Sequence, residues 1–266
     1  MDAVINGARI HWERTGHGRP LFLLHAGCAD GRMWGPQVAA FATHFDVMRP
    51  DTRGFGQSTL PPSPWSPSED LLALMNELDG KHAHLVGCSM GGSIAIEFAI
   101  EHPERVSRLV LVGSAVRGYV PTEESRQVFA EEHAARQAGD VEALNTALMH
   151  LLLDGPNRPR GYVRQPLRDL FLDMNGRAIR TDHSPAPQQR LEPPAVQRLG
   201  EITAPTLVVV GDCDLPHVLD MADLLTRSIP RARKVVIHDA AHLPNLEHPE
   251  EFNHAVLDFL LVDHDI

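Results

Sequence analysis

The most informative segment of this chain reads Ala83-His84-Leu85-Val86-Gly87-Cys88-Ser89-Met90-Gly91-Gly92. Its first four residues, apolar apart from His84, are typical of a buried strand, and residues 91–102 have the apolar period of a helix that ends near Pro103. Ser89 therefore lies in a tight turn between strand and helix, in the pattern G-x-S-x-G. Glycines at the flanking positions let neighbouring backbone come close while the hydroxyl points away from the sheet. The turn predicts a nucleophilic serine.

On both sides of this turn, short apolar segments alternate with longer segments of helical period. This alternation is typical of a mostly parallel sheet with helices on both faces. Strands are predicted at residues 9–15, 21–24, 45–48, 83–86, 109–112, 206–210 and 234–237. Helices are predicted at 91–102, about 219–229 and 249–260, and Ser68 can cap a further helix that runs to Leu78.

The alternation stops between about Tyr119 and Gln197. Residues 123–137, 141–153 behind an Asp140 cap, and 163–174 all have helical patterns, with proline and glycine between them. No strand pattern interrupts them. We therefore expect an α/β core of residues 1–118 and 197–266, with residues 119–196 inserted as a helical cap.

Composition narrows the class of protein. The chain has 266 residues, 43% of them apolar, which suits one large domain. A net charge of −11 disfavours nucleic acid or an anionic membrane as the main partner. No apolar run approaches the ~20 residues that span a bilayer, and no secretory signal is evident, so we expect a cytoplasmic protein. The three cysteines and 16 histidines lack the spacing of a disulfide framework or metal site, so no metal is expected.

A nucleophilic serine needs a base within hydrogen-bond reach and an acid that orients the base. In proteins whose serine lies in a G-x-S-x-G turn between strand and helix, the acid and the base follow it along the chain in the order Ser, acid, His. The predicted strand 206–210 ends in Gly211-Asp212-Cys213-Asp214, and strand 234–237 ends in His238-Asp239-Ala240-Ala241-His242. Asp212 and Asp214 both remain candidates for the acid. His242 is favoured over His238 as the base, because it lies farther out on its loop and just before a helix.

When a nucleophilic serine attacks a carbonyl group, the oxygen of the tetrahedral intermediate becomes an oxyanion, which backbone N–H groups must bind. One is expected from Met90, directly after the serine, and one from the loop His25-Ala26-Gly27-Cys28, where Gly27 is our candidate. His25 is best interpreted as a histidine that bonds this loop.

Together these motifs resemble the α/β-hydrolase superfamily, and within it the lactonase and esterase branch that includes 3-oxoadipate enol-lactonases. The resemblance covers essentially the whole chain. It is carried by His25 with Trp34, by Asp51-Thr52-Arg53-Gly54-Phe55-Gly56-Gln57-Ser58, by the serine turn, by Gly211 to Asp214, and by His242 with Glu247-His248-Pro249.

The resemblance implies an eight-stranded sheet, a helical cap inserted after the sixth strand, and hydrolysis without metal or organic cofactor. It favours Asp214 as the acid. Two features depart from close families: Ala26 stands where glycine is usual, and Ser89 stands where haloalkane dehalogenases and epoxide hydrolases have aspartate. Those two reactions are therefore excluded.

The expected activity is hydrolysis of a small-molecule carboxylic ester or lactone through an acyl-serine, by a monomer or homodimer. Alternatives are acyl transfer, carbon–carbon bond hydrolysis or perhydrolysis with the same residues, or a ligand-binding receptor of the same fold.

Substrate contacts are expected from His25, Cys28, Trp34, Phe129 and Leu152. Leu148, Tyr162 and Phe171 either line the pocket or pack within the cap. The arginines of the insert (Arg158, Arg160, Arg164 and Arg168) are expected mainly on a solvated face, and the alternative is contact with a substrate carboxylate.

Overall fold

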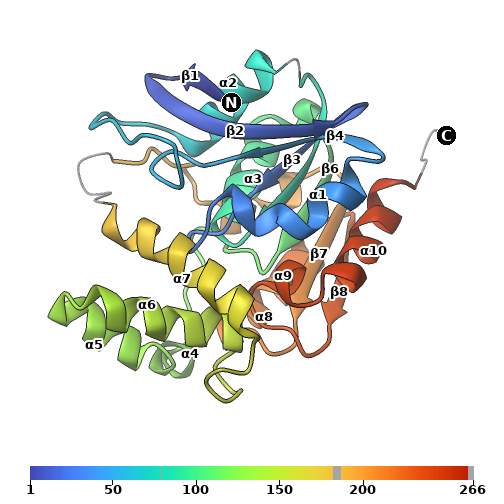
Figure 1. Ribbon diagram of the computed structural model, residues 1–266. Helices are drawn as coiled ribbons and strands as arrows, with labels where there is room; N and C mark the ends of the chain where they lie inside the picture. Colours follow the sequence, from blue (N-terminus) through green and yellow to red (C-terminus); the bar gives the residue numbers. More distant parts are fainter. Residues whose placement is uncertain (79, 182–186, 263–266) are drawn as a thin grey trace.

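The computed structural model describes residues 1–78, 80–181 and 187–262. Its centre is one twisted eight-stranded sheet in the order β1-β2-β4-β3-β5-β6-β7-β8 (Figure 1). The strands β3 to β8 run parallel, whereas β2 pairs antiparallel with both β1 and β4. Their bounds are β1 Asp2–Ile5, β2 Ala8–Gly16, β3 Arg19–Leu24, β4 Phe45–Pro50, β5 Ala83–Cys88, β6 Val106–Val112, β7 Thr206–Gly211 and β8 Ala232–Ile237.

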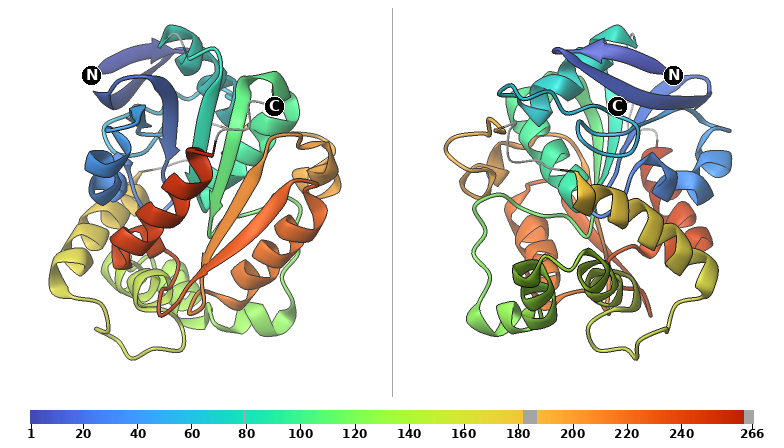
Figure 2. Two further views of the ribbon diagram at one scale, coloured as in Figure 1. Left: turned by 90° about the vertical axis from the view of Figure 1, so that its right-hand side faces the viewer. Right: turned by 60° about the vertical axis from the view of Figure 1, so that its left-hand side comes forward.

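Helices cover both faces of the sheet (Figure 2). One face packs against α2 (Pro67–Glu77), α3 (Met90–Glu101) and α8 (Pro216–Ser228), and the other against α1 (Gly35–Phe41) and α10 (Pro249–Leu260). Neighbouring residues of a strand point to opposite faces, so Leu85 and Val86 of β5 belong to different cores. Burial on both faces explains why the central strands are mainly apolar, with exceptions such as His84 in β5 and Arg108 in β6.

The predicted cap follows β6 and precedes β7. It consists of α4 (Glu123–Gln127), α5 (Ala130–Ala138), α6 (Val141–Met149), a π-helical turn at His150–Asp154, and α7 (Gln165–Arg180). These helices lie together beyond one end of the sheet (Figures 1 and 2). The α/β-hydrolase fold expected from the sequence, with eight strands and a helical insert after the sixth, is thus confirmed. None of the described helices is long and apolar enough to cross a bilayer.

Several predicted boundaries differ from the structure. The α2 helix is capped by Ser66, whose hydroxyl accepts from the Glu69 N–H at 3.3 Å, and not by Ser68, which is buried in the first turn. Pro67 explains the shift, because proline is well suited to the first position of a helix. The predicted helix 123–137 is broken at Val128 and Phe129.

Several short elements were not predicted from the sequence. The edge strand β1 has only one buried residue in four, so it lacks an apolar pattern. The α1 and α9 (Pro244–Glu247) helices are seven and four residues long, too short for a helical period.

The predicted Asp140 cap is confirmed. The α6 helix begins directly after Asp140, whose carboxylate accepts from the Ala143 N–H at 2.9 Å.

Candidate active site

Ser89 occupies a strained turn between β5 and α3. Its φ of +51° is unusual for a residue with a side chain. The Ser89 N–H donates to Val112 O at 2.9 Å, which ties the turn to β6. A Cβ on Gly87 would lie 2.4 Å from Gly91 O, and one on Gly91 would lie 2.3 Å from Leu24 O. The turn therefore requires glycine at both flanking positions, as the sequence indicated.

Asp214 and His242 come together from the loops after β7 and β8. The His242 Nδ1–H donates to the Asp214 carboxylate, 3.0 Å from each oxygen, and both side chains are buried. Burial alone would lower the pKa of His242, but the charge and hydrogen bond of Asp214 outweigh it and raise that pKa. This arrangement fixes the tautomer and directs Nε2 away from the acid.

The competing residues form a separate, exposed pair. Asp212 lies 2.9 Å from His238 Nδ1 and also accepts from the Asp239 N–H at 2.8 Å. The structure therefore distinguishes the two aspartates and the two histidines by geometry: Asp214 pairs with His242, and Asp212 holds the turn that precedes it.

Ser89 and His242 line one cavity of about 430 Å³ beneath the cap. Between the described residues no hydrogen bond joins the Ser89 hydroxyl to His242. Such contacts are often long in a free enzyme and shorten when substrate binds. The wall is mainly apolar and includes Phe129, Leu148, Leu152, Val218 and Met221.

The loop after β3 lies beside the serine turn. Gly27 borders the same cavity as Met90, and a Cβ on Gly27 would contact the Met90 side chain at 3.6 Å. Neither the Gly27 nor the Met90 N–H finds a protein acceptor among the described residues. Met90 opens α3, so its N–H belongs to the free donors at a helix N-terminus. Both groups are available to a developing oxyanion.

His25 holds this loop in place. Its Nδ1–H donates to Ala26 O at 2.8 Å, and its Nε2 accepts from the Thr52 N–H at 2.9 Å. Burial lowers the pKa of His25, so the ring stays neutral and keeps this tautomer. The expectation that His25 also contacts substrate is wrong, because the side chain is fully buried and both nitrogens are used.

The other expected substrate contacts divide into two groups. Cys28, Phe129 and Leu152 border the cavity, together with Leu148. Trp34 does not, because it is fully buried and packs against Phe252 with ring centroids 6.2 Å apart. Phe171 is likewise buried inside the cap, and Tyr162 is exposed.

Polar residues that sequence reasoning missed also border the cavity. His217, the second residue of α8, faces the Phe129 ring at 5.5 Å, and burial lowers its pKa. Arg190 lies 3.6 Å from the buried carboxylate of Glu97. Asn175 of α7 donates to Asn145 at 2.8 Å. No local pattern marks these residues, because each reaches the cavity only through tertiary packing.

Two of the four insert arginines are less solvated than expected, whereas Arg160 and Arg164 are exposed as expected. Arg158 and Arg168 have side chains only 8% and 15% exposed, and each pairs with a buried carboxylate. Arg160 does lie on the surface, paired with Glu131. Within the described residues, no group of three or more histidine, cysteine or acidic side chains could hold a metal ion.

The sheet, the serine turn and the paired Asp214 and His242 at the ends of later strands define a hydrolase of the α/β class. The chain belongs to the alpha/beta hydrolase fold family, which matches residues 19–249.

Relatives with different named substrates cover nearly the whole chain. It is 31% identical to a 2-hydroxy-6-oxononadienedioate/2-hydroxy-6-oxononatrienedioate hydrolase of Cupriavidus pinatubonensis, over 95% of this chain and 90% of the relative. It is 28% identical to a pimeloyl-[acyl-carrier protein] methyl ester esterase of Aeromonas hydrophila, over 93% and 98%. The solved enol-lactonase of Burkholderia xenovorans matches with a TM-score of 0.78 and 27% identity, over 98% of this chain and 100% of that chain.

Proposed function

We propose that this chain hydrolyses a carboxylic ester or lactone of a small molecule through an acyl-serine intermediate. The observation that carries the proposal is the pairing of His242 Nδ1 with buried Asp214 at the wall of the cavity that holds Ser89. We further propose that the enzyme is cytoplasmic, is a monomer or homodimer, and needs no metal or organic cofactor.

The reaction proceeds in two halves. The Ser89 hydroxyl attacks the carbonyl carbon while His242 Nε2 takes its proton, and the N–H groups of Gly27 and Met90 bind the oxyanion. The tetrahedral intermediate collapses, and His242 returns the proton to the leaving alcohol. Water then attacks the acyl-serine with His242 again as base, which releases the acid and restores the Ser89 hydroxyl.

The apolar wall favours a substrate with an apolar acyl or alcohol part. Phe129, Leu148 and Leu152 of the cap line the cavity together with Val218 and Met221 of α8. Burial of such a group against these side chains contributes about 25 cal/mol per Å² of apolar surface.

The test is turnover of p-nitrophenyl acetate by Ser89→Ala and Asp214→Asn, with Asp212→Asn as the matched control on the same loop. We expect Ser89→Ala to abolish turnover and Asp214→Asn to reduce kcat on the order of 10³- to 10⁴-fold. Asp212→Asn should keep near-normal activity, because Asp212 pairs with exposed His238. Unchanged turnover by Ser89→Ala in a folded protein would remove the serine from the mechanism.

A second candidate is hydrolysis of a carbon–carbon bond by the same residues. It is favoured by the 31% identity to the Cupriavidus hydrolase named for a 2-hydroxy-6-oxo dienedioate. Incubation with 2-hydroxy-6-oxo-6-phenylhexa-2,4-dienoate, the compound in the name of a Burkholderia cepacia relative, separates the two. Loss of the dienoate absorbance with release of benzoate would support carbon–carbon cleavage, and its absence alongside ester turnover would support the first proposal.

A further inference from the structure

Glu247 holds the backbone next to the candidate base. It closes the short helix α9, and its side chain is only 4% exposed. Its Oε1 accepts from the Ala241 N–H at 2.7 Å, one residue before His242. Its Oε2 accepts from Arg158 Nη2, also at 2.7 Å. The carboxylate therefore connects the His242 loop to a residue of the cap.

Arg158 uses its whole guanidinium to bridge the cap and this loop. Its Nη1 donates to Asp239 O at 3.0 Å and to the Asp239 carboxylate at 3.3 Å, on the core side. Its Nη2 and Nε donate to Leu153 O and Asp154 O, on the cap side. The Tyr162 ring lies 4.4 Å from the guanidinium and its hydroxyl donates to Asp239 at 2.7 Å. An arginine with this many partners is held in one position.

The π-helical turn of the cap makes a further contact. Leu152 O accepts from the His242 N–H at 3.2 Å, so the cap bonds the backbone of the base itself. Gly155, which ends this turn, approaches the acid loop as well: a Cβ there would lie 2.8 Å from Cys213 O and 3.3 Å from the Ala241 side chain. Single π-helical turns within helices occur frequently at functional sites.

These contacts join the cap to the loops of Asp214 and His242, whereas Ser89 is held by the sheet through Val112. We propose that Arg158 and Glu247, called here the cap clamp, are positioning residues that hold His242 in reach of Ser89 and make the placement of the base depend on the cap. This inference rests on the proposed function. The clamp touches no reacting atom and acts only through the His242 loop.

Charge gives the cap clamp a second measurable effect. The groups that face Glu247 are Arg158 from the cap and His248 beside it, and those that face His242 are Asp214, Glu247 and His217. Burial raises the pKa of Glu247 to about 7, although Arg158 opposes the shift. The Glu247 charge in turn raises the pKa of His242. Loss of that charge should therefore move the acid limb of the kcat/KM profile to lower pH.

The experiment compares Glu247→Gln, Arg158→Met and the double variant on p-nitrophenyl acetate. An error of about 1 Å in a catalytic group costs on the order of 10²-fold, so we expect kcat to fall 10- to 100-fold with KM changed less than about threefold. If Arg158 acts through Glu247, the double variant should resemble the single variants and not the product of their effects. Arg158→Lys should restore part of kcat.

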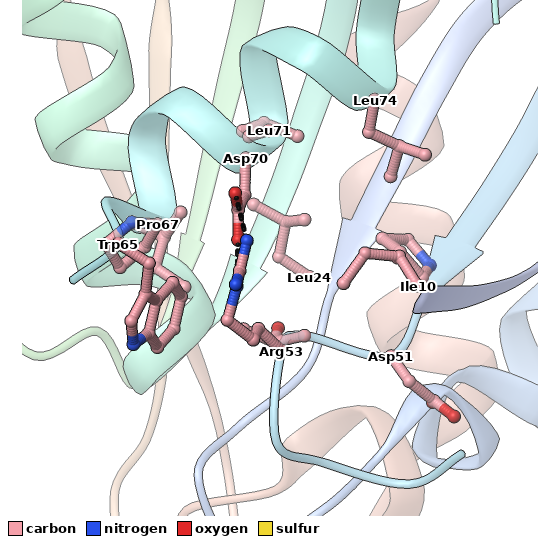
Figure 3. Close-up of a pocket in the computed structure, with 12 residues that line it drawn as sticks. Ile10, Leu24, Asp51, Arg53, Trp65, Pro67, Asp70, Leu71 and Leu74 are labelled. Carbon is pink, nitrogen blue, oxygen red and sulfur yellow. Dashed lines mark hydrogen bonds and ion pairs between the residues drawn. The ribbon is translucent and has the colours of Figure 1, made fainter. Parts of the chain in front are cut away.

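The matched control is Asp70→Asn, which breaks another buried ion pair. Arg53 binds Asp70 through Nε at 2.7 Å and Nη2 at 2.9 Å beside Trp65, under α2 (Figure 3). None of the described residues 239–242 of the His242 loop lines the pocket around this ion pair. This variant should lose stability but keep kcat and the acid limb. Hydrogen exchange of residues 239–242, followed by mass spectrometry, should increase in both clamp variants and not in the control.

Two results would overturn the cap clamp: kcat within twofold of the unaltered enzyme in both variants, or equal losses of kcat in the Asp70→Asn control. Failure of the proposed function is distinguishable, because it appears as full activity of Ser89→Ala. Hydrogen exchange in the His242 loop tests the clamp in either case.

Discussion

Gly91→Ala tests whether the serine turn and the oxyanion loop must touch. A Cβ at residue 91 would lie 2.3 Å from Leu24 O, 2.6 Å from Leu24 C and 2.7 Å from His25 O. Real Cβ contacts do not fall below 3.0 Å, so the backbone must separate by at least 3.0 − 2.3 = 0.7 Å. Because these atoms lead directly into Gly27, the displacement moves an N–H that we assign to the oxyanion. Loss of one such donor costs about 10²- to 10³-fold in kcat.

We therefore expect Gly91→Ala to lower kcat on p-nitrophenyl acetate about 100-fold, with a loss of about 1–3 kcal/mol in the free energy of unfolding from overpacking. Gly35→Ala is the control, because a Cβ there meets nothing within 4 Å and the residue begins α1. Steady-state kinetics and urea denaturation measure both effects. A folded Gly91→Ala protein with more than a third of the normal kcat would refute the argument that this contact sets the oxyanion geometry.

Two further predictions concern stability. Burial, helped by the charges of Arg19 and Arg108, lowers the pKa of His84 to about 3, so its contribution is present above pH 6.5 and is lost as pH falls. Between pH 7 and pH 4.5, the free energy of unfolding of His84→Met should therefore fall by about 2.5 kcal/mol less than that of the unaltered protein, as measured by urea denaturation. The Phe171 side chain of α7 is fully buried, so Phe171→Ala should lower the free energy of unfolding by about 3–5 kcal/mol. A loss below about 1 kcal/mol would contradict this packing.

The sheet could be predicted because its burial pattern is local. Central strands such as β5 and β7 are buried on both faces, so they appear as short apolar runs between helical segments. The edge strand β1 could not be found this way, because three of its four residues are at least partly exposed. The Ser66 cap was missed because a serine on either side of Pro67 fits the same pattern.

The candidate site was predictable to the extent that its residues follow strands. Ser89, Asp214 and His242 come after β5, β7 and β8, and parallel strands bring their carboxyl ends to one edge. Trp34 and Arg158 could not be placed in this way, because long-range packing decides where they lie. Trp34 follows the oxyanion loop in sequence but packs in the core against Phe252. Arg158 lies in a polar loop but is buried, because it binds Glu247 and Asp239, which are 80 or more positions away in the chain.

The position of the cap in the chain has an evolutionary consequence. The strands β6 and β7 pair directly, from Leu109 with Thr206 to Val112 with Val209, although the whole cap separates them in sequence. A longer, shorter or entirely different insert can join the same two neighbours without shifting the register of any strand, since loop length costs little free energy. Descendants of such a chain can acquire new specificities by exchanging this segment, provided that the new insert again supplies contacts like those of Arg158 and Leu152 with the His242 loop.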